Sequence, residues 1–159
     1  MSYQTVTDRI KSILETVEGV YNVHTYFRDI PDEQKFLEAF MVETPKGNVL
    51  SSWMMTRKSV ATERPSMSAN SILDVTHNIE IQGIYKLEDE SQTEIYFQKI
   101  IDNILDRLKT KYTLEDSSGV SLAGITQVSE INISEIGYGQ FSNYFVHFCR
   151  MNIAVEERI

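Results

Sequence analysis

The sequence feature that most constrains the fold is a long alternation over Val75–Leu87, which only Ile84 interrupts. Apolar residues, with one histidine and one glycine, occupy one parity: Val75, His77, Ile79, Ile81, Gly83, Tyr85 and Leu87. Polar residues occupy the other parity: Thr76, Asn78, Glu80, Gln82 and Lys86. This period of two predicts a β-strand with one buried face. The strand would be about 40 Å long at roughly 3.3 Å per residue, whereas strands usually have about 5–6 residues.

A strand of this length leaves two possibilities open. Either it bends at a bulge, for which Gly83 is the candidate, or its ends project from the domain as a ribbon. The predicted closing strand is nearly as long. A projecting ribbon has open hydrogen-bonding edges that need a partner. We therefore expect copies of the chain to assemble with one another.

Two helices are predicted. The first is predicted from an apolar stripe that consists of Val6, Ile10, Ile13, Leu14 and Val17. Thr5 and Asp8 form a capping-box-like start, and Gly19 is placed to end the helix. The second covers Thr93–Thr110 and follows the capping box Ser91–Glu94. Its apolar residues recur at helical spacing: Phe97, Ile100, Ile101, Ile104, Leu105 and Leu108.

The remaining predicted elements are strands, over Val20–Arg28, Phe36–Glu43, Val49–Lys58, Ile125–Ile136 and Asn143–Glu156. Phe36–Glu43 is also compatible with two helical turns. The strand is preferred because Pro45–Asn48 is a turn signal that would join it to the next strand in a hairpin. Gly137–Gln140 is predicted to be a β-turn between the closing strands.

This order of elements predicts an α+β fold, a mostly antiparallel β-sheet with two amphipathic helices packed on one face. At roughly 150 residues per domain, residues 1–159 form a single domain. The segment Ser59–Ser71 has no periodicity, and we expect a mobile loop there.

The net charge of −8 argues against specific nucleic-acid binding, because phosphate recognition needs clustered cations and the densest basic stretch is only Arg57, Lys58 and Arg64. No window is apolar for the roughly 18 residues that a membrane helix needs, and Met1–Gln4 opens no signal peptide. The single cysteine, Cys149, excludes an internal disulfide and indicates a reducing compartment. We expect a soluble, intracellular protein.

Candidate catalytic groups are sparse, and we expect no cofactor. His24, His77 and His147 fall on predicted strands but lack short metal-ligand spacing. Cys149 lies among apolar residues, which favours a buried hydrophobe over a nucleophile. Trp53, with Met54 and Met55 beside it, is compatible with a contact surface, although core packing is favoured for at least two of the three.

The order of several loose motifs resembles the tail terminators, a class of tailed-bacteriophage neck and tail-completion proteins. The motifs span about Ile10–Glu156 and comprise Gly19-Val20, Val23-His24-Thr25-Tyr26, Trp53-Met54-Met55-Thr56-Arg57, His77–Tyr85, Thr93-Glu94 and Phe97–Asp102. The resemblance implies a small α+β subunit that is not an enzyme. Such subunits form a hexameric ring that ends the growth of the tail tube and docks the head connector.

The implied partners are therefore other copies of the chain, the tail tube protein and the head–tail connector. DNA would pass through an acidic lumen without sticking. The protein would belong to the virion neck and assemble in the host cytoplasm. The loop 59–71 and the strand ends would reach the partners, with Trp53, Arg57, Lys58 and Arg64 as the candidate contact residues.

Other functions stay open at this stage. One is another head–tail joining component. A second is a small enzyme that uses a metal on His24, His77 and His147 or the thiol of Cys149. A third is a ligand-binding domain with a pocket between the helices and the sheet.

Overall fold

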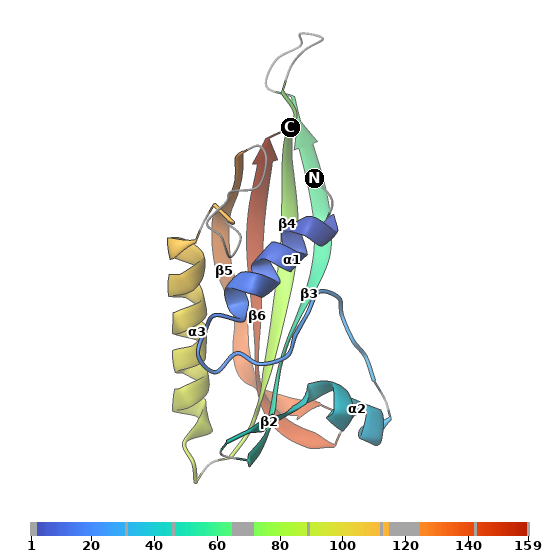
Figure 1. Cartoon of the computed structure of the whole chain (residues 1–159), viewed down its shortest axis with the longest axis vertical. Coiled ribbons are helices and arrows are strands. Elements are labelled where there is room, and N and C mark those ends of the chain that lie inside the picture. Colours follow the sequence, from blue (N-terminus) through green and yellow to red (C-terminus); the bar gives the residue numbers. More distant parts are fainter. Residues whose placement is uncertain are drawn as a thin grey trace.

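A computed structural model describes residues 3–30, 32–45, 47–64, 72–88, 90–111, 113–114, 125–141 and 143–158 (Figure 1). Within these residues, the elements are α1 (Tyr3–Leu14), β1 (Val23–His24), α2 (Glu33–Phe40), β2 (Met41–Thr44), β3 (Gly47–Glu63), β4 (Asp74–Lys86), α3 (Thr93–Thr110), β5 (Ile125–Phe141) and β6 (Tyr144–Arg158).

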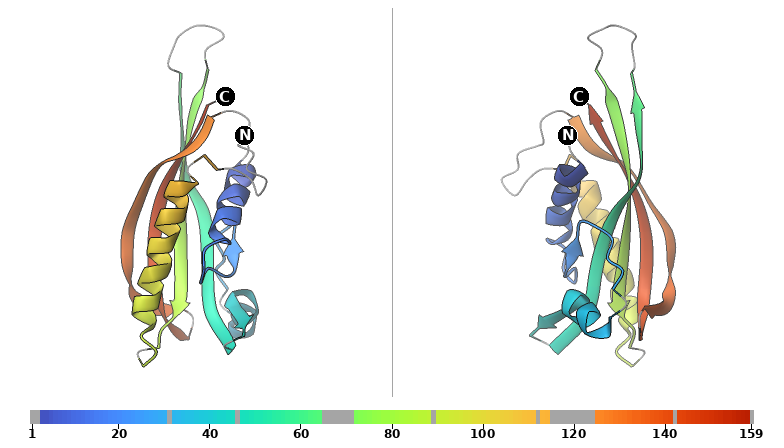
Figure 2. Two further views of the ribbon diagram at one scale, coloured as in Figure 1. Left: turned by 60° about the vertical axis from the view of Figure 1, so that its left-hand side comes forward. Right: turned by 90° about the vertical axis from the view of Figure 1, so that its right-hand side faces the viewer.

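The strands form one sheet in the order β1-β3-β4-β6-β5, with β2 paired to the start of β3. All pairs are antiparallel except β1 with β3, which is parallel. This arrangement confirms the predicted α+β class. The four long strands have 13 to 17 residues each, and the ends of β3 and β4 rise beyond the helices in Figure 2.

The alternation that predicted β4 is confirmed, but the bulge at Gly83 is not. Strand β4 pairs with β6 in unbroken register from Asp74 to Lys86. Gly83 instead lies opposite Trp53, and a Cβ atom there would be 2.3 Å from the indole ring. A glycine is needed because the ring lies against the backbone. The bulges occur in β3, between Arg57 and Ser59, and twice in β5.

One face of the sheet carries α1 and α3 side by side, as predicted (Figure 2). The main core lies between these helices and the strands. It combines the helix stripes with one parity of the sheet, including Trp53, Met55, Ile79, Ile81, Met151 and Ile153. These core side chains occupy the space between the two helices and the middle of the sheet.

A third helix, α2, replaces the first part of the strand predicted over Phe36–Glu43. Asp32 caps it by accepting a hydrogen bond from the Lys35 amide (2.9 Å). Phe36 and Phe40 lie one helical turn apart and are fully buried. They pack on the opposite sheet parity, against Leu50, Met54, Ile84 and Val146. The rest of the prediction holds, because β2 and β3 form the expected hairpin.

Several element ends differ from the sequence predictions. Thr5 lies inside α1 rather than at its cap, whereas Gly19 has the expected left-handed conformation (φ +89°). The strand predicted over Val20–Arg28 shrinks to β1, because only two of its residues pair with β3. The first residue before α3 is Gln92 in a left-handed conformation without a side-chain cap, so the Ser91 capping box is wrong.

Two predicted connections are strand instead. Residues 59–63, expected to start the loop 59–71, continue β3 and pair with β4; residues 65–71 of that loop lie outside the described residues. Gly137–Gln140, expected to be a turn, belongs to β5 and pairs with β6. In both cases the turn- and loop-forming residues predicted a connection, but hydrogen bonding to a neighbouring strand overrides such local preferences.

Candidate assembly interface

The sheet has two exposed edges. Strand β5 pairs with β6 on one side, and no described strand lies on its other side. At the opposite edge, β1 and β2 cover only the first part of β3, so the strand from Met55 to Glu63 pairs with β4 alone among the described strands, with a register shift at Lys58. Edges of this kind are templates for association with another chain.

The middle of the β5 edge is blunted. Register shifts flank Ser129 and Ser134, and the two hydroxyls donate hydrogen bonds to the carbonyl oxygens of Ala154 (3.3 Å) and Arg150 (3.2 Å) in β6. Bulges protect an edge from continuous strand pairing. Beyond Ser134 the register is regular to Phe141. A neighbour would therefore find its regular contact surface at that end of β5.

That end of β5 joins the start of α3 in an apolar surface, which we call the α3–β5 patch: Ile95 (68% exposed), Ile136 (42%), Tyr138 (76%) and Phe145 (67%). Tyr138 pairs with His147, and Phe145 lies two residues from His147 on the same sheet face. Ile95 and Tyr138 line a hollow of about 430 Å³ together with Leu87, Glu88, Gln92, Thr93, Glu94 and His147. Four large apolar side chains exposed together mark an interaction surface.

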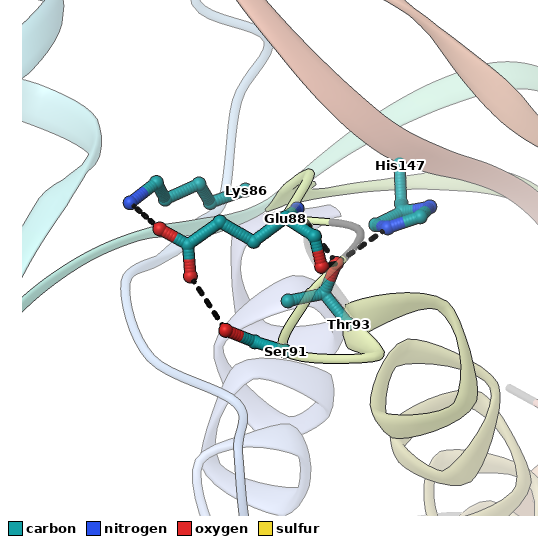
Figure 3. Close-up of polar contacts among 5 residues, drawn as sticks. All are labelled: Lys86, Glu88, Ser91, Thr93 and His147. Atoms are coloured by element: carbon teal, nitrogen blue, oxygen red, sulfur yellow. Dashed lines mark hydrogen bonds and ion pairs between the residues drawn. The ribbon is translucent and has the colours of Figure 1, made fainter.

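A hydrogen-bond network joins several of the residues that line the hollow (Figure 3). The Thr93 hydroxyl accepts from the Glu88 amide (2.8 Å) and donates to the Glu88 carbonyl oxygen (3.0 Å). Because its one proton is used, the hydroxyl accepts from Nε2 of His147 (2.9 Å). Burial lowers the pKa of His147, although the Glu94 carboxylate opposes this shift. The neutral imidazole thus ties α3 to β6.

The Glu88 carboxylate belongs to the same turn. It accepts hydrogen bonds from the Lys86 ammonium and from the Ser91 hydroxyl (3.2 Å). The Lys86 hydrogen bond is the main reason why the pKa of Glu88 is lowered. These contacts link the end of β4 to the residues that precede α3.

A second apolar surface follows β1 at the other edge of the sheet, and we call it the aromatic segment: Tyr26, Phe27 and Arg28. Tyr26 is 58% exposed and Phe27 is 48% exposed. The Arg28 guanidinium lies over the Tyr26 ring, 5.7 Å from its centroid. In Figure 1 the chain leading from β1 to α2 runs along the right side, whereas α3 and β5 lie at the left.

The four predicted contact residues are not brought together. Trp53 is only 1% exposed and stacks on Phe97, so its prediction as a contact residue is wrong; Met54 and Met55 are also buried. The Arg57 guanidinium stacks on Tyr3 of α1 (4.7 Å to the ring centroid).

Of the other two predicted contact residues, Lys58 lies in β3 and Arg64 directly follows that strand. Lys58 pairs with Glu80 (3.3 Å), and its side chain remains 55% exposed. Arg64 is exposed just after β3. Arg57, Lys58 and Arg64 therefore stay accessible along the upper half of the β3 edge, without forming one basic cluster.

The histidines have separate environments. His24 approaches the Ala39 carbonyl oxygen (3.3 Å), His77 pairs with buried Glu157 (3.1 Å) and His147 bonds Thr93. In the part of the chain that the structure describes, no three His, Cys, Asp or Glu side chains gather as metal ligands would. Burial of Cys149 raises the pKa of its thiol to about 12, which opposes nucleophilic chemistry.

Sequence reasoning missed the two exposed patches, although one signal was present. Ile95 falls off the apolar stripe of α3, since it lies two residues before buried Phe97 and is exposed. A large apolar residue on the polar side of an amphipathic helix indicates a contact surface. Tyr138 was not predicted as a contact residue, because the glycines on either side of it indicated a turn.

Comparison of the chain with protein-family models and with curated proteins finds no match. Among the described helices, none combines the length and the apolar character needed to cross a bilayer.

Proposed function

We propose that this protein is a structural subunit of a tailed bacteriophage, namely a tail terminator. Its copies would form a ring, expected to be a hexamer, that caps the tail tube and joins the tube to the head connector. It would act in the virion neck after assembly in the host cytoplasm. The proposal combines the order of sequence motifs with the architecture described above. The observation that carries it is the pair of exposed sheet edges on opposite sides of an elongated subunit.

Opposite edges favour a ring over a two-fold dimer. A contact between one edge and the different edge of the next copy is heterologous, and it closes into a ring if the rotation per subunit allows it. The four long strands and the helices on them supply a rigid body for such a ring. The projecting ends of β3 and β4 then lie at one end of each subunit, where a tube or a connector could be contacted (Figure 2).

The charge distribution is compatible with passage of DNA. The sheet parity opposite α1 and α3 carries the polar residues of β4 and Glu130 of β5, whereas Glu80 and Glu135 on the same face are paired with Lys58 and Arg150. With a net charge of −8, a ring of such subunits would repel phosphates rather than bind them. DNA could then move through a lumen without being held.

The enzyme alternative is less well supported. Its thiol version needs an accessible thiolate, whereas Cys149 is 1% exposed. Its metal version needs the histidines to converge, whereas each has a different partner. Another head–tail joining component remains the second candidate, because the exposed edges suit any ring of the neck.

Negative-stain microscopy of the purified full chain tests the proposal, combined with co-sedimentation on tail tubes of the phage that encodes it. The expected particle is a ring with a central opening and a mass of about 110 kDa, six times the 18.3 kDa of one chain. It should bind only at tube ends. Binding to connectors but not to tubes would favour the alternative neck component, and solitary subunits that bind neither would refute both.

A further inference from the structure

The two exposed apolar surfaces suggest how copies meet. We propose that the α3–β5 patch of one copy binds the aromatic segment of the next copy, with Phe27 seated in the hollow beside Tyr138. The inference rests on the proposed function, since it names the contact that would build the ring. It assigns a heterologous interface, in which two different surfaces of one chain complement each other.

The positions of the surfaces support this pairing. The α3–β5 patch lies at the β5 edge, and the aromatic segment directly follows β1 at the other edge of the same sheet. In Figure 1 the start of α3 lies at the lower left, and the chain between β1 and α2 runs on the right. Copies placed side by side in one orientation would therefore bring a patch next to a segment at every junction.

The chemistry of the hollow suits an aromatic side chain. Leu87, Ile95 and Tyr138 supply apolar walls, and a volume of about 430 Å³ falls within the usual range of small-molecule pockets. Phe27 is 48% exposed, so it could contribute new buried area on association. Aromatic residues seated in a pocket near the centre of an interface commonly supply most of its binding energy.

The charges agree with the pairing. The described residues that line the hollow include Glu88 and Glu94 but neither lysine nor arginine. Glu88 already accepts from Lys86, whereas Glu94 is exposed at the rim. Arg28 lies next to Phe27 and is held over Tyr26, so it could reach Glu94 of the neighbour. Asp29 follows with the opposite charge and would oppose this contact.

Disulfide cross-linking of full-length variants tests the pairing directly. We would prepare Phe27→Cys and Tyr138→Cys separately; both sites are exposed, so folding should be retained. After mild oxidation, each variant alone should stay uncross-linked, whereas the mixture should give a covalent dimer. The double variant should give a ladder that ends in one closed species. The buried Cys149 of the unmodified chain should form no cross-link.

A matched control uses Val60→Cys, which places an exposed thiol on β3 away from both surfaces. Mixed with Tyr138→Cys, it should yield no dimer. A multimer of unmodified protein without cross-links between positions 27 and 138 would overturn this interface but leave the ring intact. Self-cross-linking of one variant alone would show a two-fold contact and also overturn it. An unmodified protein that is solitary at every concentration and binds neither tail tubes nor connectors would refute the proposed function itself.

A charge exchange provides an independent readout. Arg28→Glu and Glu94→Arg should each weaken association about tenfold, because each replaces an attraction by a repulsion. The double variant should recover most of the affinity, since the exchanged charges meet again across the junction. Asp29→Asn should tighten association. Failure of the double variant to recover would contradict the assigned contact.

Discussion

Replacement of Gly83 by alanine should destabilise the fold strongly, although alanine normally suits a strand better than glycine. The Cβ would lie 2.3, 2.5 and 2.6 Å from three carbon atoms of the Trp53 ring. Because carbon atoms pack at about 3.5–4.0 Å, the ring would have to move by about 1 Å or more. It has no free space, since it is buried and stacks on Phe97 at 6.1 Å between ring centroids.

The magnitude follows from two opposing effects. Overpacking of a well-filled core costs about 1–3 kcal/mol, and the rigid surroundings place this site near the upper end. Removal of a strand glycine returns about 0.5–1 kcal/mol. We therefore expect Gly83→Ala to lower the free energy of unfolding by about 2 kcal/mol.

Urea denaturation followed by fluorescence of Trp53, the single tryptophan, would measure this change at one fixed, low protein concentration. Gly139→Ala is the matched control: its Cβ would meet Phe148 at an ordinary 3.8 Å, so it should raise stability by up to about 1 kcal/mol rather than lower it. A second substitution, Trp53→Leu, should make Gly83→Ala much less costly; because it removes the fluorophore, unfolding of both variants that carry Trp53→Leu would be followed by circular dichroism. An unchanged midpoint for Gly83→Ala would refute the close approach of ring and backbone.

Three further predictions concern buried polar groups. The thiol of Cys149 should react with an aromatic disulfide reagent only after unfolding, because burial raises its pKa to about 12; rapid reaction of the folded protein would contradict this. Stability should fall as the pH drops from about 7.5 to 5, because burial lowers the pKa of His24 and of His147 below 6.5 and the unfolded chain then binds more protons. His147→Gln should make the dependence of the urea midpoint on pH shallower, and an unaltered dependence would count against it. Glu157→Ala should lower the free energy of unfolding by about 2–4 kcal/mol, because it leaves the buried His77 without its carboxylate. The double variant with His77→Leu should lose less stability in urea than Glu157→Ala alone. An equal loss would show that the pair is not coupled.

The elements with strong periodicity could be predicted from the sequence. The alternation over Val75–Leu87 matches β4 closely, and the predicted helix Thr93–Thr110 has the bounds of α3. In both cases the pattern reports which side chains face the core, and burial determines the element. The same reasoning gave the two helices on one sheet face, because their apolar stripes must cover an apolar surface.

Predictions failed where local sequence competed with distant contacts. The turn signal at 45–48 favours a strand over Phe36–Phe40, but the Asp32 cap and the packing of Phe36 with Leu50, Met54 and Ile84 favour a helix. Residues 59–63 and 137–140 carry loop-forming residues, yet β4 and β6 pair with them. The pattern of apolar residues within these segments does not indicate which distant strands they will contact.

Only part of the candidate interface could be predicted from the sequence. Self-assembly could be expected from the strand length, but Trp53 was chosen because tryptophan is common in interfaces, and it lies in the core instead. The exposure of Tyr138 depends on the position of β5 at the sheet edge, which the topology determines. Ile95 alone carried a signal, as an apolar residue outside the stripe of α3.

Native mass spectrometry of the full chain over a range of concentrations shows whether its copies assemble through the exposed sheet edges. We expect one discrete multimer, several times 18.3 kDa, and its conversion to single subunits by Tyr138→Asp with an unchanged circular dichroism spectrum. If the unmodified protein has a mass of 18.3 kDa at all concentrations, its exposed edges do not mediate assembly and the account is contradicted.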